Sequence, residues 1–549
     1  MNFIEKRLKE VLTKAIYDSY QHNVDDNILM IEIPKDENNG DYSTNIAMRL
    51  TKVLKQRPLD IANSLKANLI NDEIIKDVVV AGPGFINFYI EPSFIADCIN
   101  YIIDLNEQYG VGTNQNKSIL FEYVSANPTG KLHVGHARGA VWGDACTRLL
   151  KNAGFNVGRE YYVNDGGNQI KNLGLSLYAR YRELNGLDFE LSDDGYHGKD
   201  IIEIAKRIKE EYQDHWINET NQREQFFINE GIKQQLDQIK LDLNYLRVDF
   251  DSWFSENSLY QSDVIENVIK LLGDNGYTYQ SEGALWFKST EFGDDKDRVL
   301  IKSDGSYTYL TPDIAYHLNK LMRKYDILVD LLGADHHGYI NRMKAAIAAL
   351  GYQKEQLEID IIQMVRIIEN GQEVKMSKRT GNAITIRELC DDIGVDATRY
   401  FILQRSIESH LDFDLTLARS TSNENPVYYI QYAYARICSI EKQAMTYHKQ
   451  DSYHLLNESI IIQLMKHLIE YEKVVNDAAI NRTPNKLCNY IYKLATYFHS
   501  FYTNCKINDI NNIELSIQRL NLLLSIKIVL NNSFSLIGIQ SLEEMTQED

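Results

Sequence analysis

The sequence lacks any apolar run of about 18 residues, the length that a membrane-spanning helix needs. Its first 20 residues also lack the apolar core of a signal peptide, because Ile4, Leu8, Leu12 and Ile16 recur at the spacing of one helix face. Both absences disfavour a membrane protein and a secreted one. The composition predicts a cytoplasmic protein that has no membrane partner.

Cysteine is also scarce. Six cysteines stand far apart, at positions 98, 146, 390, 438, 488 and 505, and no two of them form a CxxC pair. This spacing disfavours a disulfide framework and a zinc site, since both need cysteines grouped at short intervals. We expect a reduced environment and no structural metal.

Positive charge is in deficit, with 58 lysines and arginines against 77 aspartates and glutamates and a net charge of −19. This balance argues against binding of nucleic acid by bulk electrostatics, although a local basic patch can still bind it. Size and apolar content are ample, because 549 residues that are 44% hydrophobic can bury several cores. A chain of this length predicts about three domains.

The first region, residues 1–112, has the mixed pattern of an α+β domain. The expected strands are an apolar one over 28–33 and two over 78–90, which Gly82-Pro83-Gly84 separates. The expected helices span 4–20, 44–55 and 59–69.

The second region, residues 113–411, begins with the apolar strand "KSILFEYV", a turn rich in proline and glycine, and a helix from about His133. Strand, glycine-containing turn and helix form the phosphate-facing unit of a doubly wound α/β domain. The stretch 129–311 has no proline, and we expect much of it to be helical insertion. Strands return over 326–338 and 359–377, the latter with an Asn-Gly hairpin turn.

The third region, residues 412–549, is helical in pattern to its end. The sequence thus predicts a multidomain α/β protein. Its parts are an N-terminal α+β domain, a Rossmann-type nucleotide-binding domain with helical insertions, and an all-α C-terminal domain.

The segment "NPTGKLHVGHARGA" places His133 and His136 on one face of the first helical turn, and Gly135 between them leaves room for a ligand. A helix N-terminus attracts phosphate, and imidazoles there can donate to a phosphate whose charge grows during displacement. Two incidental surface histidines, or half of a metal site, remain alternatives for this segment alone.

A second segment, "EVKMSKRTGN", carries Lys375 and Lys378 on either side of Met376 and Ser377, after the predicted hairpin. Cations in such a loop suit the stabilisation of a leaving pyrophosphate. A solvated basic loop is the alternative. Together, "HVGH" after a strand and "KMSK" later in the chain resemble the signatures of class I aminoacyl-tRNA synthetases. That resemblance implies activation of an amino acid with ATP and its transfer to tRNA.

Four polar residues suggest which amino acid is bound. Glu122 ends the first strand and Asn127 opens the turn, while Tyr309 stands four residues before Asp313. Thr311 and Pro312 resemble an N-cap and a first helical position, so we expect Asp313 to face the pocket from a helix start. Two carboxylates, an amide and a phenol suit a guanidinium group. Alternatively, Asp313 only stabilises its own helix, and Glu122 lies on the surface.

Six segments, which include both signatures, resemble the bacterial arginyl-tRNA synthetase family, and with "NGDYSTNIAM" and "AGPGFINFYI" the likeness covers essentially the whole chain. They are "FEYVSANPTGKLHVGHARGAVWGDA", "EYYVNDGGNQI", "YTYLTPDIAYH", "LGADHHGYINR", "VKMSKRTGN" and "NENPVYYIQYAYARICSI". One departure is Gly166, where alanine is more usual in the family, and we expect it to be tolerated.

The resemblance implies the functional residues, the substrates L-arginine, ATP with Mg²⁺ and tRNA-Arg, and a monomer. The residues expected to hold arginine are Glu122, Ser125, Asn127, Tyr309, Asp313 and His336. Those expected to bind ATP are His133, Gly135, His136, Ser377 and Lys378, and those expected to act in catalysis are His133, His136, Lys375 and Lys378.

The resemblance also implies that tRNA binds before arginine is activated, and that Phe85 and Asn87 contact a base of the tRNA D-loop. A buried strand phenylalanine with a satisfied asparagine is the alternative. The C-terminal domain would hold the anticodon, with Tyr428, Tyr429, Tyr432 and Tyr434 as stacking candidates, although Tyr428 and Tyr432 have core spacing. Alternatives for the whole chain are a class I synthetase for another cationic amino acid and a catalytically silent tRNA-binding paralogue.

Overall fold

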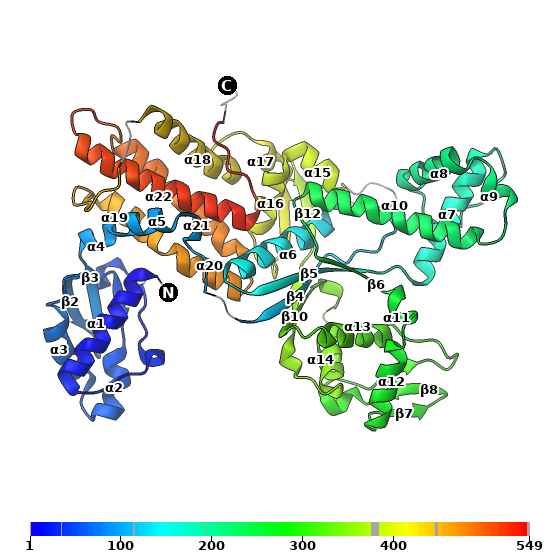
Figure 1. Cartoon of the computed structure of the whole chain (residues 1–549), viewed down its shortest axis with the longest axis horizontal. Coiled ribbons are helices and arrows are strands. Elements are labelled where there is room, and N and C mark those ends of the chain that lie inside the picture. The colour runs from blue at the N-terminus through cyan, green and yellow to red at the C-terminus, as the bar shows by residue number, and fades with distance from the viewer. Residues whose placement is uncertain are drawn as a thin grey trace.

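A computed structural model describes the chain over residues 2–34, 36–113, 116–192, 194–336, 338–374, 384–444 and 448–545. In Figure 1, an N-terminal unit lies at the lower left and a helical C-terminal unit above it. A central parallel sheet lies beside both of them, and two insertions project from the sheet to the right. Chain segments far apart in sequence therefore meet around this one sheet.

The N-terminal unit packs helices on one face of a three-stranded antiparallel sheet, in the order β1-β3-β2. The predicted strand over 28–33 is wrong, because Glu32 forms only an isolated bridge with Ser43. Asp25 caps a 3₁₀ turn that occupies Asp26–Ile28, so the chain enters the sheet late. The elements are α1 (Phe3–Tyr20), α2 (Ile46–Leu54), α3 (Pro58–Leu69), β1 (Tyr42–Thr44), β2 (Ile75–Ala81) and β3 (Phe85–Ile90), followed by α4 (Pro92–Ala96) and α5 (Cys98–Leu105).

The central sheet has five parallel strands in the order β11-β10-β4-β5-β6. In chain order β4 comes first and lies in the middle, so the strand order reverses between β4 and β10. The carboxyl ends of the strands at such a reversal are where doubly wound sheets bind their ligands. The strands are β4 (Ser118–Glu122), β5 (Asn156–Val163), β6 (Ser252–Ser255), β10 (Ile327–Gly333) and β11 (Leu357–Ile362).

Helix α6 (Val134–Asn152) follows β4, as the sequence predicts, and most of its residues are buried. Gly143 lets the helix approach the end of β4 closely, because a Cβ atom there would lie 2.4 Å from the Tyr123 ring. The helix that carries the histidine segment is therefore fixed against the strand that carries Glu122.

The stretch 129–311 is only partly the helical insertion that we expected. A helical arm with its own apolar core does leave β5, but the stretch also supplies β5, β6 and a three-stranded antiparallel sheet, β7-β8-β9. Short strands of four residues carry too little alternation to be recognised in the sequence. The arm comprises α7 (Gly167–Leu184), α8 (Lys199–Tyr212), α9 (His215–Asn218) and α10 (Arg223–Tyr245).

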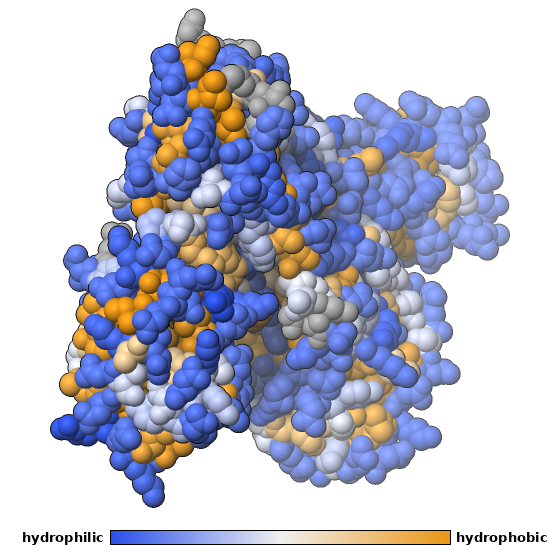
Figure 2. Space-filling view, turned by 60° about the vertical axis from the view of Figure 1, so that its left-hand side comes forward, coloured by the Kyte–Doolittle hydropathy of each residue, from blue (hydrophilic) through white to orange (hydrophobic). Residues whose placement is uncertain are grey.

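Below the sheet in Figure 1, a lower lobe packs around a second apolar core. Figure 2 shows a mostly hydrophilic surface that is hollowed between this lobe and the N-terminal unit. The lobe comprises α11 (Asn257–Tyr260), α12 (Val264–Asp274), β7 (Thr278–Ser281), β8 (Ala284–Phe287), β9 (Arg298–Ile301), α13 (Leu310–Met322) and α14 (Tyr339–Ala349).

A small sheet, β13-β12-β14, follows the central sheet. The predicted Asn-Gly hairpin is confirmed, because Asn370 and Gly371 both have positive φ, 49° and 76°, and join β12 to β13. The elements here are β12 (Val365–Glu369), β13 (Gln372–Glu373), α15 (Ile386–Ile393), α16 (Val395–Leu403) and β14 (Leu411–Asp414).

The rest of the chain is helical, as predicted, and packs against α5 and α6. α22 is long and apolar enough on average to cross a membrane, but 72% of its most apolar window is buried inside the protein, as in the core helix of a globular domain. All six cysteines are buried and free. The helices are α17 (Leu415–Arg419), α18 (Pro426–Gln443), α19 (Ser459–Ile469), α20 (Tyr471–Ile480), α21 (Pro484–Asn504) and α22 (Ile513–Ile537).

Candidate active site

The carboxyl end of β4 turns sharply into the site. Glu122 is the last residue of the strand, and Val124 and Ser125 follow with φ of 70° and 43°. A β-branched residue in the left-handed region is strained, and such strain is characteristic of functional turns. The turn places the Ser125 hydroxyl where it donates to Glu122 Oε1 at 2.9 Å and accepts from the Tyr162 N–H at 3.1 Å.

The two histidines cap α6 as a reciprocal pair. Nδ1 of His133 accepts from the Gly135 N–H at 3.1 Å, and Nδ1 of His136 accepts from the His133 N–H at 3.2 Å. An Nδ1 atom that accepts a hydrogen bond carries no proton, so Nε2 is the protonated atom of each neutral ring. The rings lie 3.9 Å apart, centre to centre. Two N–H donors are thereby grouped at the N-terminus of a helix, the end that attracts phosphate.

The second signature, with Lys375, Ser377 and Lys378, lies outside the described residues. The chain that follows it is joined to the first signature by backbone hydrogen bonds. The Val134 N–H donates to Ile384 O at 3.1 Å, and the Ile386 N–H donates to Leu132 O at 2.9 Å. Residues 132–134 and 384–386 thus lie side by side although they are distant in sequence.

A buried chain of charges links α13 to the end of β4 and the middle of β10. The Lys320 ammonium bonds Glu122, and it donates to Asp330 Oδ1 at 2.7 Å. His317 bonds Asp330 Oδ2 through Nε2 at 2.8 Å and the Asp313 carbonyl through Nδ1 at 2.7 Å. Burial opposes ionisation of Asp330, but the Lys320 and His317 charges hold its pKa well below its usual range.

Asp313 stands at the open end of this chain. Burial, together with the carboxylates of Glu256 and Glu122, raises the pKa of Asp313 to about 7, although the charge of His317 and a hydrogen bond from Tyr339 act in the opposite direction. Burial also raises the pKa of Glu256, which is only 9% exposed. Neither Asp313 nor Glu256 forms an ion pair with a lysine or arginine among the described residues. Two neighbouring carboxyl groups without such a cation make a site for a positively charged ligand.

The remaining residues predicted to bind arginine are Asn127, His336 and Tyr309, and none of them belongs to the buried chain of charges. Asn127 donates to Gln169 Oε1 at 2.7 Å. His336 is exposed just beyond β10, beside Tyr339. Tyr309 is 90% exposed and does not lie among the buried groups, so its assignment stays a prediction.

The predicted start of the helix that carries Asp313 is wrong by two residues. α13 begins at Leu310, with Tyr309 as its N-cap, so Thr311 and Pro312 lie inside its first turn. The Thr311 hydroxyl donates to Leu300 O at 2.8 Å and therefore does not cap the helix. Asp313 nevertheless lies in the first turn of the helix, and its contact with arginine stays a prediction.

The residues predicted to contact tRNA differ in exposure. Phe85 is 39% exposed on β3, whereas Asn87 is 4% exposed and accepts from the Ser43 hydroxyl at 2.7 Å. Tyr428 and Tyr432 stack on each other half-buried on α18, with ring centres 6.0 Å apart, while Tyr434 is buried.

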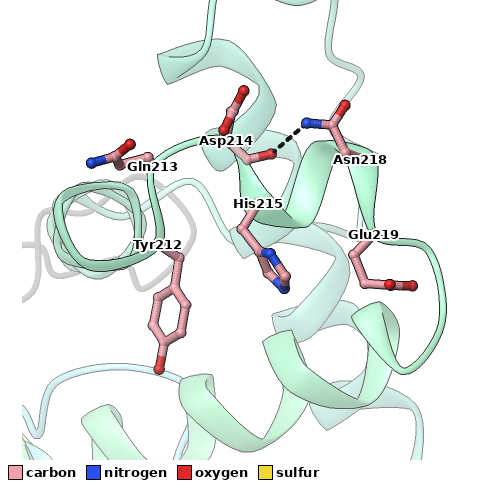
Figure 3. A pocket seen from close by; sticks show the side chains of 6 residues that line it. All are labelled: Tyr212, Gln213, Asp214, His215, Asn218 and Glu219. Carbon is pink, nitrogen blue, oxygen red and sulfur yellow. Dashed lines mark hydrogen bonds between the residues drawn. The ribbon is translucent and has the colours of Figure 1, made fainter.

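A separate hollow of about 530 Å³ lies on the helical arm, between α8 and α9 (Figure 3). Its lining is polar and open, and none of the predicted site residues contributes to it. The one hydrogen bond drawn there joins Asn218 Nδ2 to Asp214 O at 3.4 Å. It has none of the buried charge that marks the site at the sheet edge.

Several residues of the site were not recognised in the sequence. They are Glu256, Lys320, Asp330, His317 and Tyr339. His317 and Lys320 follow Asp313 at intervals of four and seven, which places them on one helix face, so the pattern of α13 held a usable signal. Asp330 gave a second usable signal, because it lies inside the apolar run of β10 and a charge buried in a strand needs a partner.

The fold contains a reversed parallel sheet, the first signature follows its central strand β4, and the sequence carries the second signature at residues 375–378. These features together define a class I aminoacyl-tRNA synthetase. Comparisons with protein families agree. Residues 2–90 match the arginyl tRNA synthetase N terminal domain, residues 99–409 the catalytic domain of tRNA synthetases class I (R), and residues 430–545 the DALR anticodon binding domain.

Individual relatives agree as well. The chain is 48% identical to the arginine–tRNA ligase of Listeria monocytogenes and 49% identical to that of Bacillus cereus, over 524 residues and 94% of each chain. A crystal structure of an arginyl-tRNA synthetase from Campylobacter jejuni is 35% identical, with a TM-score of 0.76 over 83% of this chain and 100% of that one. The chain belongs to the arginyl-tRNA synthetase family. Its function is that of an arginine–tRNA ligase, which uses ATP, arginine and tRNA-Arg.

Proposed function

We propose that arginine is bound and activated at the carboxyl ends of β4 and β10, with its guanidinium between Asp313 and Glu256. The observation that carries this assignment is the pair of carboxyl groups, neither of which pairs with a lysine or arginine among the described residues. A guanidinium presents five donors in a planar fork and can engage two carboxylates at once. The ammonium of lysine is a compact point charge and cannot match both.

Lys320 already occupies the carboxylate of Glu122 on one side. Glu122, with Ser125 and Asn127 next to it, is therefore the end of the pocket that receives the α-ammonium of arginine. His336 lies at the rim. This orientation leaves the arginine carboxylate facing the N-terminus of α6, where ATP is expected.

ATP binds in this proposal with its phosphates at the N-terminus of α6. His133 and His136 donate through Nε2, and Gly135 allows the phosphates to approach the backbone. Lys375, Ser377 and Lys378 bind the pyrophosphate from the second signature. Mg²⁺ enters as the complex with ATP and offsets the charge of the leaving pyrophosphate.

The reaction needs no protein nucleophile. An oxygen of the arginine carboxylate attacks the α-phosphorus, the bond to the β-phosphate oxygen breaks, and pyrophosphate leaves with the electron pair. A ribose hydroxyl of the terminal adenosine then attacks the carbonyl carbon of the adenylate and displaces AMP. Position and charge stabilisation supply the catalysis.

The flanking units bind tRNA in this proposal. The domains are residues 1–112, 113–411 and 412–549. Phe85, exposed on β3, is the contact for a tRNA base in the first domain, with Asn87 behind it, and the third domain holds the anticodon. The enzyme acts as a cytoplasmic monomer.

The activity is tested by ATP–pyrophosphate exchange with purified chain, arginine and a tRNA pool. We expect exchange that depends on both arginine and tRNA, and no exchange above background when lysine replaces arginine. Exchange with lysine, or none with arginine in the presence of tRNA, would remove the proposed specificity.

Arginine binding is expected to weaken as the pH falls below 7. Burial raises the pKa of Asp313 to about 7, so the group is ionised above that pH and neutral below it. A bound guanidinium favours the ionised form, and binding therefore competes with a proton. The measurement is kcat/KM for arginine between pH 5.5 and 8.5 at saturating ATP. We expect a plateau above pH 7 and a fall of about tenfold per pH unit well below it. A flat profile across this range contradicts the assignment of Asp313.

A further inference from the structure

Arg138 is a fully buried arginine in the first signature helix, two residues beyond His136. Its guanidinium bonds only backbone carbonyl oxygens among the described residues. The contacts are Nη1 to Gln363 O at 2.7 Å and to Met364 O at 3.3 Å, and Nη2 to Ser406 O and Ser409 O, both at 2.8 Å.

The two segments that Arg138 joins form the base of the small sheet. Residues 363–364 connect β11 to β12, and residues 406–409 lead into β14. The segments also bond each other, because the Gln363 N–H donates to Ile407 O at 3.0 Å and the Leu411 N–H donates to Met364 O at 3.2 Å. β12 continues through the Asn-Gly turn into β13, and the second signature follows at residue 375.

Packing alone does not explain an arginine at this position. Burial lowers the pKa of Arg138 to about 10, so the group stays charged at neutral pH and loses hydration. An apolar side chain would fill the same volume without that cost. The planar fork of a guanidinium, however, can span two loops at once, which a single ammonium cannot do.

We propose that Arg138 is a positioning residue for amino-acid activation, which fixes the β12–β13 hairpin against the helix that carries His133 and His136. In this role it contacts none of the three substrates and acts through β12. The inference rests on the proposed function, in which the two signatures bind the phosphates of one ATP molecule. A misplacement of about 1 Å between such groups costs on the order of a hundredfold in rate.

The test compares Arg138→Lys with Arg399→Lys. Arg399 is an equally buried arginine that bonds Asp144 and the carbonyl oxygens of Ile537 and Leu246, away from the hairpin. Arginine-dependent exchange is measured with saturating tRNA, together with thermal unfolding of each protein. For R138K we expect kcat to fall at least tenfold, with KM for arginine within twofold of the wild type. For R399K we expect kcat within threefold, even where its loss of thermal stability is as large.

A kcat of R138K within threefold of the wild type, or an equal loss in R399K, overturns the proposal. If R138K does not fold, hydrogen exchange of the wild-type enzyme tests whether the two segments are held together. The amides of Gln363 and Leu411 are expected to exchange as slowly as those of the core helix α21, and rapid exchange through local opening overturns the proposal. An inactive wild-type chain would instead remove the proposed function, so the two failures are distinguishable.

Discussion

Replacing Asp313 with asparagine is expected to lower kcat/KM for arginine by about 150- to 5,000-fold, which corresponds to roughly 3–5 kcal/mol. Asparagine keeps the shape of the side chain but removes the charge that faces the guanidinium, so the bound cation loses one of two carboxylates. The measurement is arginine-dependent exchange with saturating ATP and tRNA. The pH dependence below 7 should disappear in the same variant, because the titrating group is gone.

The variant should not lose stability. Burial opposes ionisation of Asp313 in the free enzyme, and the neighbouring Glu256 adds repulsion, so a neutral residue relieves both costs. Asp274→Asn, at the exposed end of α12, serves as the control with the same chemical change. If D313N loses less than tenfold in kcat/KM, or if D274N loses as much, Asp313 does not bind the substrate.

Replacing Lys320 with methionine is expected to destabilise the fold by roughly 3–5 kcal/mol and to abolish activation of arginine. Lys320 is 1% exposed and neutralises Glu122 and Asp330 on adjacent strands. Methionine fills much the same volume but leaves two carboxylates facing each other out of water. Thermal unfolding at pH 8 and the exchange assay measure the two effects.

The pH dependence of this loss has a definite sign. In the variant, Glu122 and Asp330 lose the ammonium that they share, and Asp330 keeps its bond to His317. The pKa values of the two carboxyl groups are then expected to be raised in the folded state, so the folded protein binds more protons than the unfolded one. Its stability therefore rises as the pH falls, and the gap to the wild type narrows between pH 8 and pH 5. Lys270→Met, on the exposed face of α12, should leave stability within about 0.5 kcal/mol at both pH values. A gap that stays constant with pH would show that Lys320 acts by packing and not by charge.

The elements that the sequence predicted well are those with strong local signals. The helix after His133, the Asn-Gly hairpin and the helical C-terminal region all follow from periodicity and turn chemistry within a few residues. The class I signatures and the arginyl family likeness were likewise readable, because they depend on contiguous segments. Features of this kind can be predicted without knowledge of the rest of the fold.

The predictions from sequence were wrong or incomplete where contacts between distant residues determine the structure. Residues 28–33 have the composition of a strand, but only Glu32 forms a β-bridge, so strand pairing and not β-propensity decided the structure of this segment. Glu256 joins the pocket because β6 pairs with β5, and no local sequence pattern predicts the register of that pairing. The pairing of Lys320 with Glu122 likewise requires α13 and β4 to be brought together across nearly 200 residues of chain.

The backbone bonds between residues 132–134 and 384–386 bear on how this enzyme tolerates mutation. Main-chain hydrogen bonds join the first signature to the chain that follows the second signature, so these bonds do not depend on which side chains stand at residues 132, 134, 384 and 386. Substitutions at these positions can therefore accumulate without breaking the bonds, as long as the apolar packing is kept. Proline is the exception at Val134 and Ile386, whose N–H groups are the donors.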